Sequence, residues 1–235
     1  MLRPDAPLVV GEKSASSMAA EQFRTLTVQL EQSLKPSGDS GFVLGVTSSE
    51  PGAGKTLTSL NLVLTMAPQG TARRLLLIEC DLWNPSLRDY LDVEPELPGL
   101  YQLLSGDVSF SEAKVPLWAS MVDIILAGRG GEVGNLMNDE RIEEVLARAR
   151  DEYEIVILDT PPFFLASGRS LSGLSDGILV LARAGETSKS SIEDLLSALD
   201  ADKVLGMSLT HVSQKNLRIE TAGAYSYYAY RKEDQ

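Results

Sequence analysis

The sequence predicts an α/β fold, in which helices cover both faces of a doubly wound, mostly parallel sheet. Short runs of continuously apolar residues recur along the chain, as in strands that are buried on both faces. Helical patterns lie between these runs, and one junction between a strand and a helix is rich in glycine. With 235 residues, 43% of them hydrophobic, the chain can bury one substantial core. We therefore expect a single domain over residues 18–213, between a flexible lead at 1–17 and a flexible tail at 214–235.

The expected elements alternate as they do in parallel sheets. Strands are expected at residues 42–47, 74–80, 122–127, 154–159, 177–182 and 204–212. Helices are expected at 18–34, directly after the glycine-rich turn, at 139–153 and at 190–201. In the first of these helices apolar side chains recur at helical spacing, and Pro36 and Gly38 then end it.

The composition excludes several classes of protein. A net charge of -12 argues against a general nucleic-acid binder, which needs a basic face to neutralise phosphates. Cys80 is the only cysteine and His211 the only histidine, so an intrachain disulfide is excluded and a zinc site is disfavoured. No window approaches the apolar length of a spanning helix. We expect a cytoplasmic protein that does not insert into the membrane directly.

The stretch "FVLGVTSSEPGAGKTLTSLNLVLTMA" places a strand, a glycine-rich turn and a helix in direct succession, as in a P-loop. Backbone N–H groups there are expected to wrap a phosphate at the helix N-terminus, with Lys55 reaching the β and γ phosphates and Thr56 ligating Mg²⁺. Ser49 stands where the motif has its first glycine, and a glycine turn before an ordinary helix is the alternative. The expected nucleotide-binding residues are Gly52, Ala53, Gly54, Lys55, Thr56 and Leu57.

Two other predicted strands end in carboxylates that are suited to hold the metal ion. "LLLIECD" ends in Glu79 and Asp81, and "IVILD" ends in Asp159. Ligands in open α/β sheets bind at the carboxyl ends of the strands, where these acids are expected to lie. Glu79, Asp81 and Asp159 are therefore the candidate acids for holding the metal ion beside the Thr56 hydroxyl. Solvated acids at strand ends are the alternative.

The last residues, "AYSYYAYRKEDQ", concentrate tyrosines in a segment that is expected to be exposed. Terminal segments are usually poorly ordered unless something ties them down, so these rings either bind something or are acted upon. An edge strand with alternating tyrosines is the alternative. The clustered residues are Tyr225, Tyr227, Tyr228 and Tyr230.

Taken together, these motifs resemble the bacterial tyrosine kinases that regulate capsule and exopolysaccharide synthesis, a branch of the MinD/ParA-like P-loop ATPases. The resemblance runs over nearly the whole chain. The motifs that carry it are "EQFRTL", "SSEPGAGKT", "LLLIECDLWNPSLRDYL", "ILDTPP", "GILVLARAGET" and the tyrosine-rich tail.

The resemblance implies that ATP and Mg²⁺ are the cofactors and that Lys55, Asp81 and Asp159 are catalytic, with Glu79 in the place of a first acid. It implies that Thr56, Asp81 and Asp159 are the metal ligands. It implies that the tail tyrosines accept phosphate from a neighbouring subunit in a ring, with Glu21 and Arg24 as oligomer contacts. It further implies a partner, the cytoplasmic segment of a membrane polysaccharide co-polymerase, which recruits the chain to the inner membrane.

Four positions depart from the pattern of the resembled family. Glu79 and Trp83 stand where that family has Asp and Arg in the second acidic motif. Thr27 replaces an Arg of the oligomer motif, which weakens the expected ring, and Gly168 stands where an Asp usually follows "DTPP". We therefore expect a regulator that binds nucleotide and has impaired phosphoryl transfer. The alternatives are an active tyrosine autokinase and a ParA/MinD-type positioning ATPase, which Glu50 and the tail disfavour.

Overall fold

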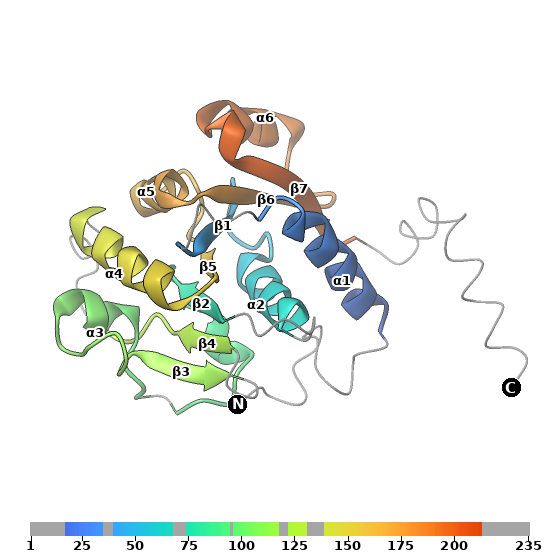
Figure 1. The fold of residues 1–235 in the computed structure, drawn as a ribbon. Coiled ribbons are helices and arrows are strands. Elements are labelled where there is room, and N and C mark those ends of the chain that lie inside the picture. The colour runs from blue at the N-terminus through green and yellow to red at the C-terminus, as the bar shows by residue number, and fades with distance from the viewer. Residues whose placement is uncertain are drawn as a thin grey trace, which may run out of the picture.

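A computed structural model of the chain describes residues 17–34, 40–67, 74–94, 96–117, 122–130 and 139–212. The strands are β1 (Phe42–Ser48), β2 (Leu75–Glu79), β3 (Lys114–Leu117), β4 (Val122–Ile125), β5 (Ile155–Asp159), β6 (Gly177–Arg183) and β7 (Val204–Thr210). They form one seven-stranded sheet in the order β3-β4-β2-β5-β1-β6-β7 (Figure 1). The tyrosine-rich tail and residues 1–16 of the predicted lead lie outside the described residues.

The sheet is parallel apart from one edge strand, which confirms the predicted fold class. β1 lies at its centre and pairs with both β5 and β6 in parallel. Only β3, which the sequence pattern did not reveal, runs antiparallel to its neighbour β4. The predicted strand at 204–212 ends at Thr210, two residues earlier than expected. Because parallel strands end at the same edge, the carboxyl ends of β1, β2 and β5 meet there.

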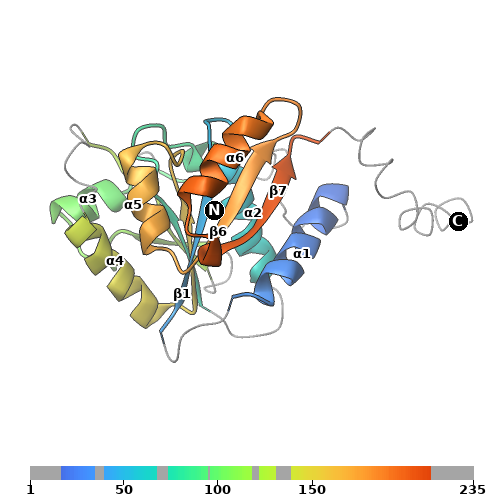
Figure 2. The ribbon, with the colours of Figure 1, turned by 90° about the horizontal axis from the view of Figure 1, so that it is seen from above.

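Helices cover the sheet in two layers. They are α1 (Met18–Glu31), α2 (Lys55–Met66), α3 (Leu100–Ser105), α4 (Asp139–Glu152), α5 (Ala166–Leu174) and α6 (Lys189–Ala198), with 3-10 turns η2 (Leu87–Asp89) and η3 (Ala201–Lys203). The view in Figure 2 shows α1 and α2 on one side of the sheet and α4, α5 and α6 on the other. In the described residues, no helix has both the length and the apolarity needed to cross a membrane.

Two apolar layers fill the spaces between the sheet and the helices. On one side, side chains of β1, β2 and β5 pack against α2, which is buried along almost its whole length and is covered in turn by α1. On the other side, Val43, Ile78 and Val156 pack with side chains of α3 and α4. A further cluster, around Ile178 and Leu195, lies beneath α6. This burial on both faces explains why the strands read as continuous apolar runs.

A polar contact joins α1 to α2 inside the apolar layer. Thr27 is fully buried, and its hydroxyl oxygen lies 2.7 Å from that of Thr65. Thr65 donates to the carbonyl of Asn61 at 2.8 Å, so the Thr27 hydroxyl is the donor between the two. The position that replaces an arginine of the oligomer motif therefore faces the interior of the molecule.

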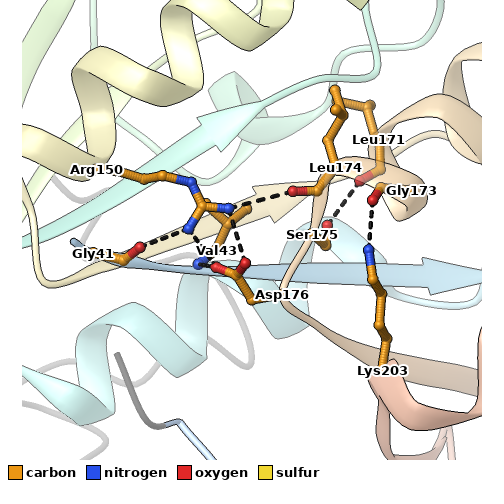
Figure 3. A network of polar contacts seen from close by, with 9 residues as sticks. All are labelled: Gly41, Val43, Arg150, Leu171, Gly173, Leu174, Ser175, Asp176 and Lys203. Atoms are coloured by element: carbon orange, nitrogen blue, oxygen red, sulfur yellow. Dashed lines mark hydrogen bonds and ion pairs between the residues drawn. The ribbon is translucent and has the colours of Figure 1, made fainter. Parts of the chain in front are cut away.

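The amino-terminal edge of the sheet is closed by an ionic contact that we call the Arg150 clasp (Figure 3). Arg150, near the end of α4, donates to Asp176 through both terminal nitrogens, at 2.5 and 3.0 Å. The same guanidinium donates to the carbonyl of Gly41 at 2.8 Å, and Asp176 also accepts the backbone N–H of Val43 at 2.8 Å. The clasp thus ties α4 and the start of β6 to the start of β1.

Candidate nucleotide-binding site

The glycine-rich turn between β1 and α2 has the backbone shape of an anion-binding loop. Gly52 and Gly54 adopt left-handed conformations, with φ of 75° and 84°, which favour glycine because it has no Cβ. Gly54 is the N-cap residue of α2, and no side chain caps this helix end. Such a helix N-terminus presents backbone N–H groups and a positive dipole end to an anion. The residues from Gly52 to Leu57 therefore form the end of this loop and the first turn of α2.

Lys55, the first residue of α2, points into this site. Its side chain is buried, and Nζ donates to the Ser48 hydroxyl at 3.3 Å. Burial lowers the pKa of Lys55, while the negative charges of Asp159 and then Asp81 oppose that shift. The lysine and both acids are thus close enough to interact electrostatically. The structure brings together three of the side chains that the sequence assigned to one site.

Asp159 ends β5 beside the loop, and it is 1% exposed. Its pKa is raised to about 7, chiefly by burial and also by the negative charges of Glu79 and Asp81, whereas the Thr56 hydroxyl and the Lys55 ammonium oppose the rise. Within the described part of the chain, neither carboxylate oxygen of Asp159 has a hydrogen-bond partner. A buried carboxylate without partners is costly unless a cation or a donor completes it.

Other unsatisfied buried oxygens lie in or next to the same loop. The Thr47 and Ser49 hydroxyls and one carboxylate oxygen of Glu50 also lack partners among the described residues. These atoms follow one another at the carboxyl end of β1, opposite the end of β5. Asp159 supplies carboxylate oxygens that suit a divalent cation, and the uncapped helix end supplies N–H donors for phosphate. The residues present therefore fit a nucleotide with its magnesium ion.

Glu79 ends β2 and lies opposite Asp159 in the sheet, but both of its oxygens are occupied. One oxygen accepts the backbone N–H groups of Ser86 and Leu87 at 2.7 and 2.6 Å, and the other accepts that of Ala127 at 2.9 Å. Burial raises the pKa of Glu79, and these three N–H donors oppose the rise. The expected catalytic role of Glu79 stays a prediction, but its carboxylate holds together the segments that follow β2 and β4.

Asp81 and Ser86 lie in the segment that Glu79 holds. Asp81 is half-buried and accepts the backbone N–H of Asn84 at 3.0 Å. The Ser86 hydroxyl donates to the Thr56 hydroxyl oxygen at 2.9 Å. Thr56, in the first turn of α2, therefore has a polar neighbour that no motif pointed to.

The ends of β6 and β7 also contact the loop. The Thr210 hydroxyl donates to the carbonyl of Ala53 at 2.8 Å, and a Cβ at Gly52 would lie only 3.5 Å from a guanidinium nitrogen of Arg183. His211 follows β7 with a φ of 56°, and its exposed ring lies beside Gly54. Sequence reasoning placed His211 in or at the end of a strand and missed Thr210 and Arg183, because nothing local marks contacts made across the sheet.

The structure shows what surrounds Trp83 and Gly168, two of the positions that depart from the resembled family. Trp83 is 67% exposed at the carboxyl edge of the sheet, where it offers a neutral ring in place of a cation. Gly168 packs against the backbone of Pro162, and a Cβ at position 168 would lie only 2.3 Å from the Pro162 carbonyl oxygen. An aspartate at 168 would therefore need a backbone shift. Cys80 is buried, and desolvation raises the pKa of its thiol.

The remaining predicted site residues lie elsewhere or outside the described part of the chain. Glu21 and Arg24 form an ion pair at 2.8 Å on the exposed side of α1. The four tail tyrosines fall in residues 213–235, which the structure does not describe.

Known proteins resemble this chain over most of its length. A family model described as an AAA domain matches residues 43–205. The chain is 27% identical over 224 residues to tyrosine-protein kinase wzc of Salmonella typhimurium, covering 94% of this chain and 30% of that protein. It is 26% identical over 222 residues to tyrosine-protein kinase YwqD of Bacillus subtilis, covering 94% of this chain and 90% of that protein.

Two further matches extend the comparison. Succinoglycan biosynthesis transport protein ExoP of Rhizobium meliloti is 26% identical over 208 residues, which cover 86% of this chain and 26% of that protein. The kinase domain of the Escherichia coli tyrosine kinase ETK superposes with a TM-score of 0.79 at 23% identity, covering 91% of this chain and 83% of the other, and this likeness concerns the fold. The chain thus spans less than a third of wzc and ExoP and almost all of YwqD.

Proposed function

The chain belongs to the AAA domain family and is similar to bacterial tyrosine-protein kinases, and from this premise we propose that it is an ATP-binding regulator of exopolysaccharide or capsule synthesis with weakened phosphoryl transfer. The observation that carries nucleotide binding is the buried Asp159 carboxylate, without partners among the described residues, beside Lys55 at an uncapped helix end. Lys55 would bind phosphate oxygens, and Thr56, Asp81 and Asp159 would hold Mg²⁺. When bound, Mg²⁺ would neutralise charge on the phosphates.

The weakened transfer rests on the groups around Asp159 and Asp81. In-line phosphoryl transfer depends on charges placed within a fraction of an ångström, whereas binding tolerates more variation. The Glu79 carboxylate is engaged by three backbone N–H groups, and Trp83 supplies no positive charge. The chain would then still bind nucleotide, but it would have fewer groups that stabilise the charge on the phosphoryl group during transfer.

Calorimetric titration tests nucleotide binding. We expect the full chain to bind ADP and ATP in the presence of Mg²⁺, and Lys55→Ala to lose at least tenfold in affinity, because a buried charged hydrogen bond contributes about 1.5–3 kcal/mol. Lys189→Ala, at an exposed lysine that pairs with Glu193, is the matched control and should bind normally. No heat of binding in the unaltered chain would refute the proposed nucleotide site.

A second candidate, an active tyrosine autokinase, is favoured by the juxtaposition of Lys55, Asp81 and Asp159. The two candidates differ in the phosphotyrosine that forms when the purified chain is incubated with ATP and Mg²⁺. We expect little labelling. Strong labelling that disappears in Lys55→Ala, and in a variant with phenylalanine at the four tail tyrosines, would establish the autokinase and overturn the weakened-transfer proposal.

The proposed partner is the cytoplasmic segment of a membrane polysaccharide co-polymerase, which would recruit the chain to the inner membrane. Support comes from the similarity to ExoP, named as a succinoglycan biosynthesis transport protein. The test is fractionation of cells that contain the chain with or without the candidate co-polymerase. Membrane association that does not depend on the co-polymerase would argue against this partner.

A further inference from the structure

The inference concerns a chain of contacts that begins at Glu79 and ends at the Thr56 hydroxyl. Glu79 is 1% exposed, and one of its oxygens accepts the backbone N–H groups of Ser86 and Leu87. This fixes the backbone of residue 86 at the start of η2. From there the Ser86 hydroxyl reaches across to Thr56 at 2.9 Å. Two segments that are 30 residues apart in the sequence are thereby joined at the metal side of the site.

The contacts of Glu79 leave it little capacity to bind a metal ion. A carboxylate has about four lone-pair positions, and three of them face the N–H groups of Ser86, Leu87 and Ala127 at 2.6 to 2.9 Å. Such charge-assisted bonds are about twice as strong as neutral ones. Moving the carboxylate toward a cation would leave buried N–H groups unpaired, which is costly. Asp159, opposite Glu79 in the sheet, has both oxygens unpaired among the described residues instead.

We propose that Ser86 is a positioning residue for the Thr56 hydroxyl, and that Glu79 is the anchor that holds Ser86 in place rather than a metal ligand. This inference rests on the proposed binding of nucleotide and Mg²⁺ at the loop. Its chemistry is that of paired hydroxyls. Each hydroxyl has one proton and two lone pairs, so the pair can exchange donor and acceptor roles.

Ser86 now donates to Thr56, so the Thr56 proton points away from Ser86. A Thr56 oxygen that gives a lone pair to a cation can turn its own proton toward the Ser86 oxygen, which then becomes the acceptor. The Ser86 hydroxyl therefore orients the Thr56 hydroxyl both without and with a bound cation. An alanine at 86 removes this oxygen and leaves the backbone N–H that Glu79 holds.

The test is calorimetric titration with ADP, once in Mg²⁺ and once in EDTA. A residue that positions a metal ligand changes the ratio of the ADP affinity in Mg²⁺ to that in EDTA, whereas general damage to the loop lowers both affinities equally. We expect Ser86→Ala to lower the affinity gain from Mg²⁺ by about three- to tenfold, the range for one neutral hydrogen bond. Its affinity in EDTA and its unliganded Tm should change little. Ser86→Thr, which keeps a hydroxyl, should restore the gain.

Glu79→Gln tests the anchor. The amide brings its own N–H groups against buried backbone donors, so we expect a lower unliganded Tm together with loss of the Mg²⁺ gain. The matched control is Glu112→Gln, at an exposed glutamate that also accepts a backbone N–H, from Ser109 at 2.8 Å, and it should behave as the unaltered chain.

Three results would overturn the inference. In the first, Ser86→Ala keeps the full Mg²⁺ gain while the unaltered chain binds normally. In the second, Ser86→Ala weakens binding equally in EDTA and in Mg²⁺, which indicates general damage to the loop. In the third, the unaltered chain binds no ADP in either condition, and then the proposed function fails and the inference fails with it. The first two results leave the proposed nucleotide site standing, so the two failures are distinguishable.

Discussion

At the scale of single residues, the buried carboxylate of Asp159 should contribute to the pH dependence of the unliganded molecule. Its pKa is about 7 in the folded chain, against about 3.9 for an aspartate in an unfolded chain. Between these values the folded chain holds more protons than the unfolded chain. The contribution of this group to the free energy of unfolding is therefore greatest below pH 4 and falls as the pH rises to about 7.

Asp159→Asn should remove this dependence. In EDTA we expect the variant to gain about 1–3 kcal/mol of stability over the unaltered chain at pH 8, with a much smaller gain at pH 5. Urea unfolding at the two pH values measures the difference. Asp202→Asn, at an exposed aspartate, is the control and should leave the pH dependence in place. Equal slopes in Asp159→Asn and the unaltered chain would show that another group is responsible.

Residues of the site differ in how far the sequence revealed them. Lys55, Thr56 and Asp159 follow from one local pattern each, a loop motif or a strand end. Glu79 was visible as an acid, but its N–H partners come from two later segments that only the folded chain brings near. Ser86 and Thr210 carry no local signal, because a serine or a threonine acquires a site role only through a tertiary contact.

At the scale of elements, the contact between α1 and α2 decides what residue 27 can be. Thr27→Arg would restore the arginine of the oligomer motif, yet we expect it to destabilise the chain by about 3 kcal/mol or more, because it buries a charge without a partner. Thr25→Arg, on the exposed side of the same helix, should change stability by about 0.5 kcal/mol or less. Urea unfolding followed by circular dichroism compares them, and equal stability of the two variants would contradict the buried position.

The Arg150 clasp gives a second prediction at this scale. Arg150→Ala should cost about 1–2 kcal/mol, because it removes hydrogen bonds to Asp176 and Gly41 in a partly exposed setting. Affinity for ADP should not change, since the clasp lies at the opposite end of β1 from the loop. Arg129→Ala breaks an exposed pair with Glu96 and should cost under about 0.5 kcal/mol. Weaker ADP binding in Arg150→Ala would show that the two edges are coupled.

The elements that the sequence missed are short or have weak propensities. β3 has four residues and contains Pro116, which is tolerated at an edge strand but gives no strand signal. α3 spans six residues, too few to show a helical period. α5 reads "ASGRSLSGL", in which glycines and serines lower helix propensity, so its packing against the sheet determines its structure.

At the scale of the whole molecule, ligand binding and folding are one equilibrium. ADP with Mg²⁺ at about 100 times its Kd should add about 2.7 kcal/mol to the free energy of unfolding and raise Tm by about 5–10 °C. Thermal unfolding with and without ligand measures the shift, and Lys55→Ala should lack it. A shift of equal size in Lys55→Ala would place the binding site elsewhere.

The general architecture was predictable because it follows from many residues at once. Every predicted strand is present, with ends that differ by at most two residues, since continuous apolar runs leave no alternative to burial on both faces.

The Arg150 clasp has a consequence for how such a chain evolves. It secures the fold at one end of the central strand, while the phosphate loop and its acids occupy the other end. Substitutions at the loop that weaken a reaction therefore leave the contacts of the Arg150 clasp unchanged. A protein of this kind can lose its reaction through successive substitutions and still keep the fold that a partner protein binds.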